Sequence, residues 1–230
     1  MKYGKTKKYR KVARKSSRKK VKRTNFKKYG TTRSRAINGP MAMRQIVKMR
    51  YSEDINISAG TLLGAYDFRA NSIFDPNLSG TGHQPLPHDQ WGNFYDHYVV
   101  LGAKMTVVFT STSATDSAFA SVALQDTNNT MTSQSQIREQ PRSKWTLIPI
   151  QGGNNQRKLT CFYSAKKFFG AKSVVTWDKL GAVFGANPSE DALFRIFYQN
   201  ASGTSAIALV VNVIIDYIVL LSEPKVLTLS

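Results

Sequence analysis

The first fifty residues carry a block of positive charge that has no acidic counterpart. Residues 1–50 contain 20 of the 33 Lys and Arg residues of the chain, and the first acidic residue is Glu53. The remaining 180 residues hold 13 basic and 14 acidic side chains, so the net charge of +19 belongs almost entirely to the N-terminal segment. Like charges at this density repel one another and cannot build a core. The sequence therefore predicts a cationic arm, disordered when free, joined to one nearly neutral folded domain.

The charge of the arm has several functional interpretations. Lys and Arg neutralise nucleic-acid phosphates, and aromatic rings stack on unpaired bases; four such rings lie between the charges, at Tyr3, Tyr9, Phe26 and Tyr29. Residues 19–23 (KKVKR) also match a nuclear-localisation signal, which would bind a nuclear import receptor. A membrane-surface tether or a mitochondrial presequence is disfavoured because the arm lacks an apolar helical face. The interpretation without a partner is a solvated tail that keeps the protein soluble.

We place the arm at residues 1–42 and the folded domain at residues 43–230. Seventeen basic residues of the arm are the expected nucleic-acid contacts: Lys2, Lys5, Lys7, Lys8, Arg10, Lys11, Arg14, Lys15, Arg18, Lys19, Lys20, Lys22, Arg23, Lys27, Lys28, Arg33 and Arg35. Four of these also form the expected nuclear-localisation signal: Lys19, Lys20, Lys22 and Arg23.

Composition argues against a membrane protein or a disulfide-bonded one. The single Cys161 excludes an internal disulfide and is expected to be a small buried strand residue. The apolar stretch Ala206 to Leu221 is interrupted by Asn212 and Asp216 and is too short to cross a bilayer as a helix. The N-terminus lacks the apolar segment of a secretory signal. No membrane partner is expected.

From about Met43 the chain changes to strand patterns separated by turn-rich loops. In the last segment every odd position from Ile207 to Tyr217 is Ile, Leu, Val or Tyr, which predicts a buried central strand. Strict alternation over 97–112 would put Tyr98, Val100 and Lys104 on one side. Loops are expected at 72–90 and 181–190, a surface connection with one helical turn at 126–140, and a hairpin joining 191–200 to 204–222. The other expected strands are 46–51, 61–68, 118–125, 144–150, 157–169 and 173–177.

About eight strands and no long helix predict an all-β sandwich or barrel.

Few residues suggest a catalytic, metal or cofactor site. A metal site of His83, His88, Asp89 and Asp96 can be drawn, but no helix or strand spacing supports it. Residues 80–82 (GTG) lack the third glycine of a dinucleotide loop, and neither a Walker lysine motif nor a nucleophile elbow is present. Four aromatic residues could form a ligand cage or, with better support, anchor a loop: Trp91, Phe94, Tyr95 and Tyr98. We expect no enzyme activity, no metal and no cofactor.

A block of short motifs follows the first strands. It comprises residues 72–77 (SIFDPN), 80–85 (GTGHQP), 89–91 (DQW) and 94–98 (FYDHY). This block resembles the capsid proteins of circular, Rep-encoding single-stranded DNA viruses, the circovirus-like group. In that group such a run lies between the first strand and the next long strand of an eight-stranded jelly roll. One departure is the arm, which has 11 Lys and 6 Arg in residues 1–35 where circovirus arms favour Arg; Lys still neutralises phosphate as a point charge.

The resemblance implies a self-assembling capsid protein. Its fold would be an eight-stranded jelly-roll sandwich, and about sixty copies would close a small icosahedral shell with the arms on a single-stranded DNA genome. The 80–90 loop and the aromatic residues after it would be structural and inter-subunit elements. The protein would belong to the virion and, during assembly, to the host nucleus. A host cell-surface glycan is a further partner implied by the resemblance, with Lys166, Lys167 and Lys172 as the nearest candidates.

Three other classes of protein stay open at this point. A capsid protein of a single-stranded RNA virus has the same architecture and charge. A non-assembling nucleic-acid-binding β-barrel would carry basic and aromatic residues on one sheet face of the folded domain, which the net charge of −1 over residues 51–230 disfavours. An enzyme is the fourth and least supported class.

Overall fold

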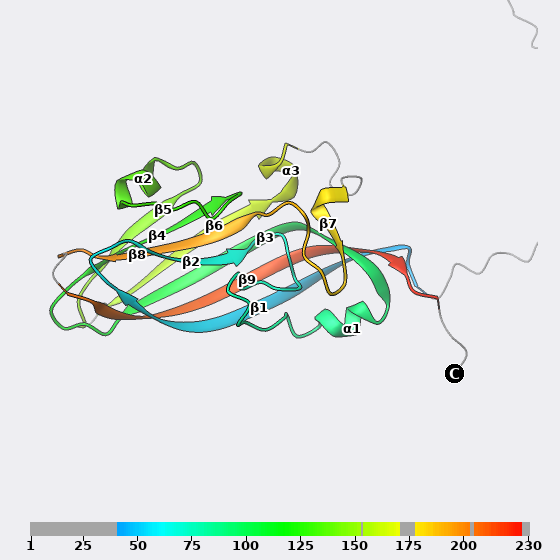
Figure 1. The fold of residues 1–230 in the computed structure, drawn as a ribbon. Coiled ribbons are helices and arrows are strands. Elements are labelled where there is room, and N and C mark those ends of the chain that lie inside the picture. The colour runs from blue at the N-terminus through cyan, green and yellow to red at the C-terminus, as the bar shows by residue number, and fades with distance from the viewer. Residues whose placement is uncertain (1–40, 153, 171–177, 203–204, 227–230) are drawn as a thin grey trace, which may run out of the picture. The chain divides into compact units, whose positions relative to one another are not determined.

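The described part of the chain forms two antiparallel β-sheets. The computed structural model describes residues 41–152, 154–170, 178–202 and 205–226. The first sheet contains β1 (Arg44–Ala59), β3 (Tyr95–Ser111), β6 (Gln156–Ser164), β7 (Gly181–Val183) and β9 (Ile207–Pro224). The second sheet contains β2 (Gly64–Arg69), β4 (Ala118–Gln125), β5 (Lys144–Ile148) and β8 (Leu193–Asn200). Figure 1 shows these strands as the two layers of a sandwich.

The strand order identifies the sandwich as a jelly roll. The first sheet has the order β1-β9-β3-β6, with the short β7 pairing with the beginning of β3. The second sheet has the order β2-β8-β4-β5. The chain crosses repeatedly from one sheet to the other, so the first and last strands, β1 and β9, become neighbours. Eight strands wound in this way form a jelly roll, which confirms the predicted fold class.

The helices of the described residues are short. They are α1 (His88–Gly92), α2 (Gln134–Glu139), α3 (Ala165–Phe168) and the 3₁₀ turn η1 (Asp178–Leu180). Ser133 caps the N-terminus of α2, because its side chain accepts a hydrogen bond from the backbone N–H of Gln136. Helix α2 confirms the helical turn predicted in the 126–140 connection. No helix in the described part of the chain combines the length and the apolar character needed to cross a membrane.

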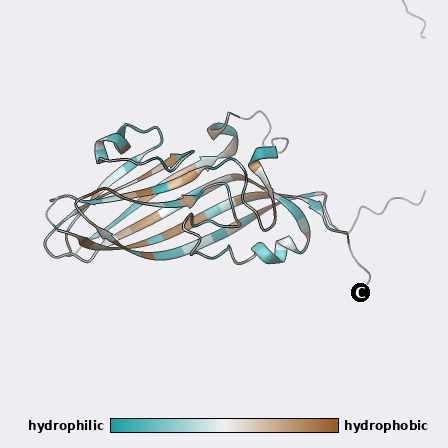
Figure 2. Cartoon of the chain, viewed as in Figure 1, coloured by the Kyte–Doolittle hydropathy of each residue, from teal (hydrophilic) through white to brown (hydrophobic). Residues whose placement is uncertain are grey.

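The core lies between the two sheets and is filled from their inner faces. The odd-numbered residues of β9 from Ile207 to Tyr217 are all buried, and β9 lies between β1 and β3, so the predicted central strand is confirmed. Phe68, Phe109 and Phe194 are fully buried in the same core. Figure 2 shows the apolar residues concentrated on the strands, while α1 and the connections are mostly hydrophilic. Each strand therefore buries one apolar face, and this burial is the main term that offsets the conformational entropy lost on folding.

The predicted hairpin between residues 191–200 and 204–222 is wrong. Strand β8 pairs with β2 and β4, whereas β9 pairs with β1 and β3. The two strands are consecutive in the chain but belong to opposite sheets. The hairpin was predicted because the connection between the two strands is short. Alternation shows which residues face the core, but it does not show which strand lies alongside.

The strict alternation predicted for 97–112 is also wrong. Tyr98 and Val100 are buried, and so are Ala103 and Met105, whereas Lys104 is exposed. The pairing of β3 with β9 shifts register between Val100 and Gly102. This β-bulge adds one residue to β3, and one extra residue exchanges the two faces of a strand beyond it.

Other boundaries also differ from the sequence prediction. The strand expected over 157–169 ends at Ser164, where α3 begins, and Phe168 of α3 packs edge-on against Tyr163. The loop expected over 181–190 begins with β7. The strand expected over 173–177 lies outside the described residues.

Cys161 provides a test of how tightly β6 packs. It is buried, as predicted, and burial raises the pKa of its thiol to about 11. Because the thiolate is the reactive form, we expect the native protein to resist iodoacetamide at about pH 8 and the urea-unfolded protein to react readily. Mass spectrometry of the alkylated chain measures both. Rapid, stoichiometric labelling of the native protein would contradict the packing of β6.

Candidate functional site

The histidines are held by hydrogen bonds that serve the fold. The ring nitrogens of His83 lie 2.7 Å from the carbonyl oxygen of Gln84 and 2.9 Å from that of Ser52, and these contacts raise the pKa of His83. His88 is buried, and its Nδ1 lies 2.9 Å from Oδ1 of Asp89. Among the residues that the structure describes, no three His, Cys, Asp or Glu side chains gather closely enough to hold a metal ion. The metal site drawn from the sequence therefore has no geometric support here.

The loop between β2 and α1 is fastened to the sandwich by a buried polar network. Asn77 is fully buried, and its Nδ2 donates to the hydroxyl of Tyr66 at 2.8 Å and to Oε2 of Glu53 at 2.9 Å. Tyr51 donates to the same carboxylate oxygen at 2.5 Å. Buried polar groups are stable only when their hydrogen bonds are satisfied. The motif block thus stabilises the fold of its own chain, and its expected inter-subunit role stays a prediction.

Gly82 tests this loop because the backbone there passes close to the network. A Cβ atom added at Gly82 would lie 2.5 Å from the hydroxyl oxygen of Tyr51 and 2.7 Å from Cβ of Asn77. We expect Gly82→Ala to lower the free energy of unfolding by about 1–3 kcal/mol through overpacking. Urea denaturation measures the change. Gly60→Ala is the matched control, since no atom lies within 4 Å of its added Cβ, and equal effects of the two substitutions would contradict the packing described.

Three of the four aromatic residues considered as a cage line one open pocket, and the fourth, Tyr98, does not. Tyr98 is fully buried, and its hydroxyl donates to the carbonyl oxygen of Ala186 at 2.8 Å. The ring of Trp91 lies 6.2 Å from Tyr95 and 6.5 Å from Phe94, beside an open pocket of about 320 Å³. The contacts of Trp91 and Tyr95 tie α1 to β3, which agrees with the interpretation of these residues as loop anchors.

The outer face of the first sheet carries charged and aromatic side chains in one row. Strand register makes successive partners of Arg50, Asp216, Lys104 and Phe162, which come from β1, β9, β3 and β6. Arg50 Nε donates to Asp216 Oδ1 at 2.6 Å, and Lys104 Nζ lies 5.9 Å from the centroid of the Phe162 ring. An open groove of about 590 Å³ follows this row and passes over Gly102. We call it the sheet groove.

A second surface lies on the edge of the second sheet. Trp145 and Leu147 of the edge strand β5 are 51% and 43% exposed. Phe119 of β4 packs beside Trp145, and the guanidinium of Arg138 lies 4.3 Å from the Trp145 ring centroid and 5.3 Å from that of Phe119. We call these four residues the edge patch. Exposed apolar side chains on an unpaired edge strand are typical of contacts between chains.

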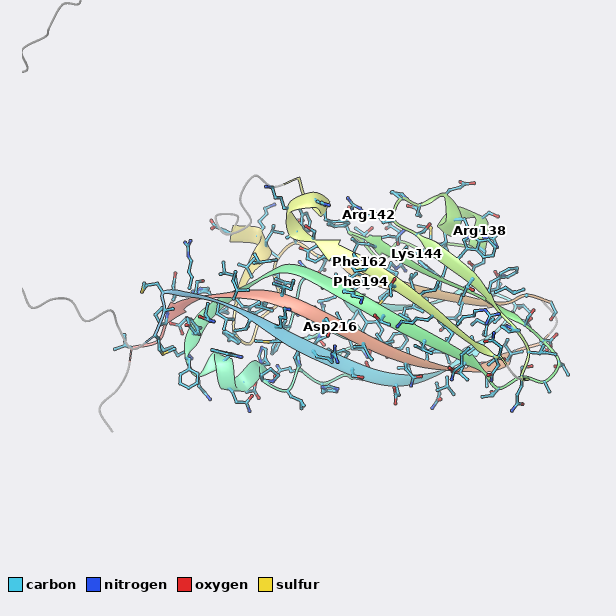
Figure 3. All side chains as sticks on the ribbon, turned by 180° about the vertical axis from the view of Figure 1, so that it is seen from behind. Arg138, Arg142, Lys144, Phe162, Phe194 and Asp216 are labelled. Carbon is cyan, nitrogen blue, oxygen red and sulfur yellow. The ribbon has the colours of Figure 1, made fainter. Side chains whose placement is uncertain are left out.

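Basic side chains also gather where β5 approaches β6. Arg142 Nη2 donates to the carbonyl oxygen of Lys167 at 3.2 Å, and its guanidinium lies 5.2 Å from the ring of Phe168. Figure 3 shows Arg142, Lys144 and Phe162 on this side of the sandwich. Lys166 and Lys167 lie on α3 and are exposed, whereas Lys172 lies outside the described residues. Glycan binding at these lysines stays a prediction.

The expected nucleic-acid and nuclear-localisation residues, Lys2 to Arg35, all lie outside the described residues, so these assignments also stay predictions. Sequence reasoning did not identify the sheet groove or the edge patch. Each surface is assembled from strands far apart in the chain, so no short sequence motif predicts it. The sequence offered one partial signal, the basic residues Lys48 and Arg50 at alternate positions of β1.

The strand order thus defines the class of the folded domain, a jelly-roll β-sandwich. No protein-family model and no curated protein matches this sequence.

Several solved viral structures have a similar fold. The 60-mer BFDV capsid protein is 13% identical with a TM-score of 0.47, over 83% of this chain and 100% of that one. The structure of Desmodium yellow mottle tymovirus is 12% identical with a TM-score of 0.43, over 81% and 92%. The semi-empty virus-like particle of Macrobrachium rosenbergii nodavirus is 11% identical with a TM-score of 0.45, over 83% and 100%. Similarity at this level says nothing about what the chain binds, and the jelly-roll assignment rests on the strand order.

Proposed function

We propose that this chain is a viral capsid protein that assembles into a closed shell around a single-stranded nucleic-acid genome. The observation that carries the proposal is the division of charge. A complete jelly-roll domain begins at Arg44, and the net charge of +19 is concentrated in the residues before it. A block of like charge needs a polyanion to neutralise it, while a nearly neutral domain can pack closely against copies of itself.

The charge balance fits packaging by many copies. About sixty subunits, the smallest icosahedral set, would bring on the order of a thousand positive charges to the genome and neutralise a comparable number of phosphates. Neutralisation of phosphates is independent of base sequence. The arm would therefore package its genome by charge.

The resemblance of the motif block supports DNA as the cargo, together with assembly in the host nucleus. The basic residues 19–23 would bind a nuclear import receptor, and the assembled protein would belong to the virion. The edge patch supplies an apolar contact between neighbouring subunits. In this role the protein acts as a structural component and carries out no reaction.

The experiment that tests the proposal is electron microscopy of the full chain after expression, combined with nuclease treatment of its nucleic acid. Uniform small round particles are expected, and the extracted nucleic acid should be degraded by DNase and resist RNase. Cargo degraded only by RNase would identify the alternative of a capsid of a single-stranded RNA virus. A strictly monomeric protein at every salt concentration and pH would contradict assembly.

Substitution in the edge patch tests how the shell is held together. We expect Trp145→Asp to lower the fraction of protein in particles by about tenfold or more, because exposed aromatic residues at interfaces contribute about 2 kcal/mol each and the contact recurs in every copy. Sedimentation of the purified variant measures this fraction. Leu62→Asp is the control, since Leu62 is 83% exposed in the connection between β1 and β2, and β2 lies at the opposite edge of the second sheet from β5. Normal particles from Trp145→Asp would exclude the edge patch as a subunit contact.

A non-assembling nucleic-acid-binding protein is the second candidate. The sheet groove favours it, since basic and aromatic side chains on one sheet face are the arrangement that such a protein needs. It would form a discrete complex of fixed stoichiometry with an oligonucleotide and no closed particles. The same micrographs therefore separate the two candidates.

A further inference from the structure

The sheet groove has an exposed aromatic ring at one end. Phe162 of β6 is 59% exposed, although its neighbours Cys161 and Tyr163 are buried. Two ammonium groups flank the ring, with Lys104 Nζ at 5.9 Å and Lys144 Nζ at 5.7 Å from its centroid. Both distances are close to the outer limit for cation–π contact, about 6 Å. The ring is therefore accessible and lies between two positive charges.

The floor of the groove is open because of the bulge in β3. The bulge places Gly102 on the outer face, opposite Ile218 of β9 and Ser164 of β6. A glycine adds no side chain to this face, so a flat ligand can approach the sheet. Ile218 is 43% exposed beside it and gives the floor an apolar surface.

The groove is cationic even though the folded domain as a whole is nearly neutral. Arg50 is paired with Asp216 at 2.6 Å. Among the described residues no carboxylate lies within 4.0 Å of Lys48, Lys104 or Lys144, so these three charges have no ionic partner there. Lys48 and Lys104 line the groove, and Lys144, on β5 of the second sheet, lies beside Phe162 at its end. Unpaired cations placed in this way attract a polyanion.

The dimensions of the groove suit a single strand of nucleic acid. From β1 to β6 the face spans three steps between strands, about 14 Å at 4.8 Å each. A stacked strand carries one phosphate about every 3.4 Å, so about four nucleotides cross this width. An exposed ring between cations is the arrangement that single-strand-binding proteins use for stacking and backbone contact.

We propose that the sheet groove is a second binding site for single-stranded nucleic acid, separate from the arm. The ring of Phe162 stacks on one base, and three lysines contact the phosphates on either side: Lys48, Lys104 and Lys144. The inference rests on the proposed function, because it takes the cargo to be single-stranded. The groove would add base stacking on Phe162 to nucleic-acid binding that would otherwise depend on the charge of the arm alone.

A second copy of the chain is the competing occupant, and charge disfavours it. In a two-fold contact the same surface meets itself, so three unpaired lysines of one copy would face three of the other. Such a contact would bring like charges together with only Ile218 and Phe162 as apolar compensation. A polyanion removes the repulsion that a second copy would create.

Photocrosslinking of the full chain tests the proposal. A single-stranded oligonucleotide with iodouracil in place of thymine, bound to the purified protein and irradiated, joins to aromatic side chains that stack on its bases. Mass spectrometry of the tryptic digest then locates the adducts. We expect one adduct in the peptide 159–166, which contains Phe162, in addition to any in the arm. Phe94 is the internal control, because it is 47% exposed but does not line the groove.

Two kinds of variant identify the binding residues. Phe162→Ala should lower the adduct in this peptide by about tenfold, and Phe162→Trp should restore it, since stacking accepts any aromatic ring. Replacing the three lysines by glutamine should lower the steepness of log K against log salt by about 2, at about 0.7 for each lysine that no longer neutralises a phosphate. The alanine variant keeps the backbone of β6 and should remain folded, as circular dichroism would show.

The outcomes separate this inference from the proposed function. Adducts confined to residues 1–42 in protein that still forms particles would overturn the groove site and leave the capsid proposal intact. Subunit-to-subunit crosslinks through Lys104 after treatment with an amine-reactive crosslinker, with no nucleotide adduct at Phe162, would assign the groove to a second copy and also overturn it. An adduct at Phe162 in protein that never assembles would support the groove and contradict the capsid proposal.

Discussion

Deletion of residues 2–35 is expected to leave a folded sandwich that has lost its nucleic acid. The deletion removes all seventeen predicted contacts and none of the strands in the described residues, the first of which begins at Arg44. It also leaves Ala42, whose carbonyl oxygen accepts a hydrogen bond from Tyr95 at 3.0 Å. If all seventeen charges contact phosphates, log K for a single strand falls with log salt at a slope of about −12, and the deletion removes most of that dependence. Absorbance of the purified protein and its circular dichroism measure cargo and fold.

A shuffled arm is the matched control for this deletion. An arm with the composition of residues 2–35 in random order should package as much nucleic acid as the native arm, because phosphate neutralisation does not depend on order. Loss of cargo with the shuffled arm would mean that the arm reads a sequence or a structure. If the deletion unfolds the β-sheets, the division into arm and domain is wrong.

Among the carboxylates that form ion pairs in the described residues, we expect the substitution Asp67→Ala to cause the largest loss of stability. The carboxylate of Asp67 lies 2.9 Å from Nε of Arg195, and the two side chains are 13% and 4% exposed. Without Asp67 the guanidinium of Arg195 would stay buried with only Gln125 and the Asn129 carbonyl as acceptors. Removing one partner of a buried pair costs about 3–5 kcal/mol. A decrease in melting temperature of about 10 °C follows for a domain of this size.

The exposed pair between Arg50 and Asp216 is the control for Asp67. Its distance is shorter, 2.6 Å, but its side chains are 67% and 42% exposed. Solvent screens such a pair, so Asp216→Ala should leave the melting temperature unchanged within error. Calorimetry of both variants makes the comparison, and equal losses would contradict the assignment of stability to burial.

Local pattern was sufficient to predict those parts of the fold in which a strand keeps one face in the core. Alternation from Ile207 to Tyr217 identified β9 and its buried face, and small apolar residues identified β4 at its observed bounds. Pattern failed at β3 because the bulge at Val100 to Gly102 exchanges its faces, and no residue type marks a bulge unambiguously. It failed for β8 and β9 because a sandwich can place consecutive strands in opposite sheets.

The candidate surfaces could not be predicted for a related reason. The row from Arg50 to Phe162 crosses four strands, and its members are separated by up to 166 residues in the chain. Such contacts depend on strand order and register, which involve the whole sandwich. The charge of the arm could be predicted because its basic residues are consecutive or nearly so in the sequence. The proposed function therefore depends on this charge more than on any contact in the folded domain.

Sedimentation velocity of the purified full chain, recorded at the absorption maxima of nucleic acid and of protein, tests the central claim most directly. The account predicts one fast, sharp boundary in which protein and nucleic acid move together, with the mass of a closed shell of many subunits. A single slow boundary with the mass of one chain, free of nucleic acid at low ionic strength, would contradict it.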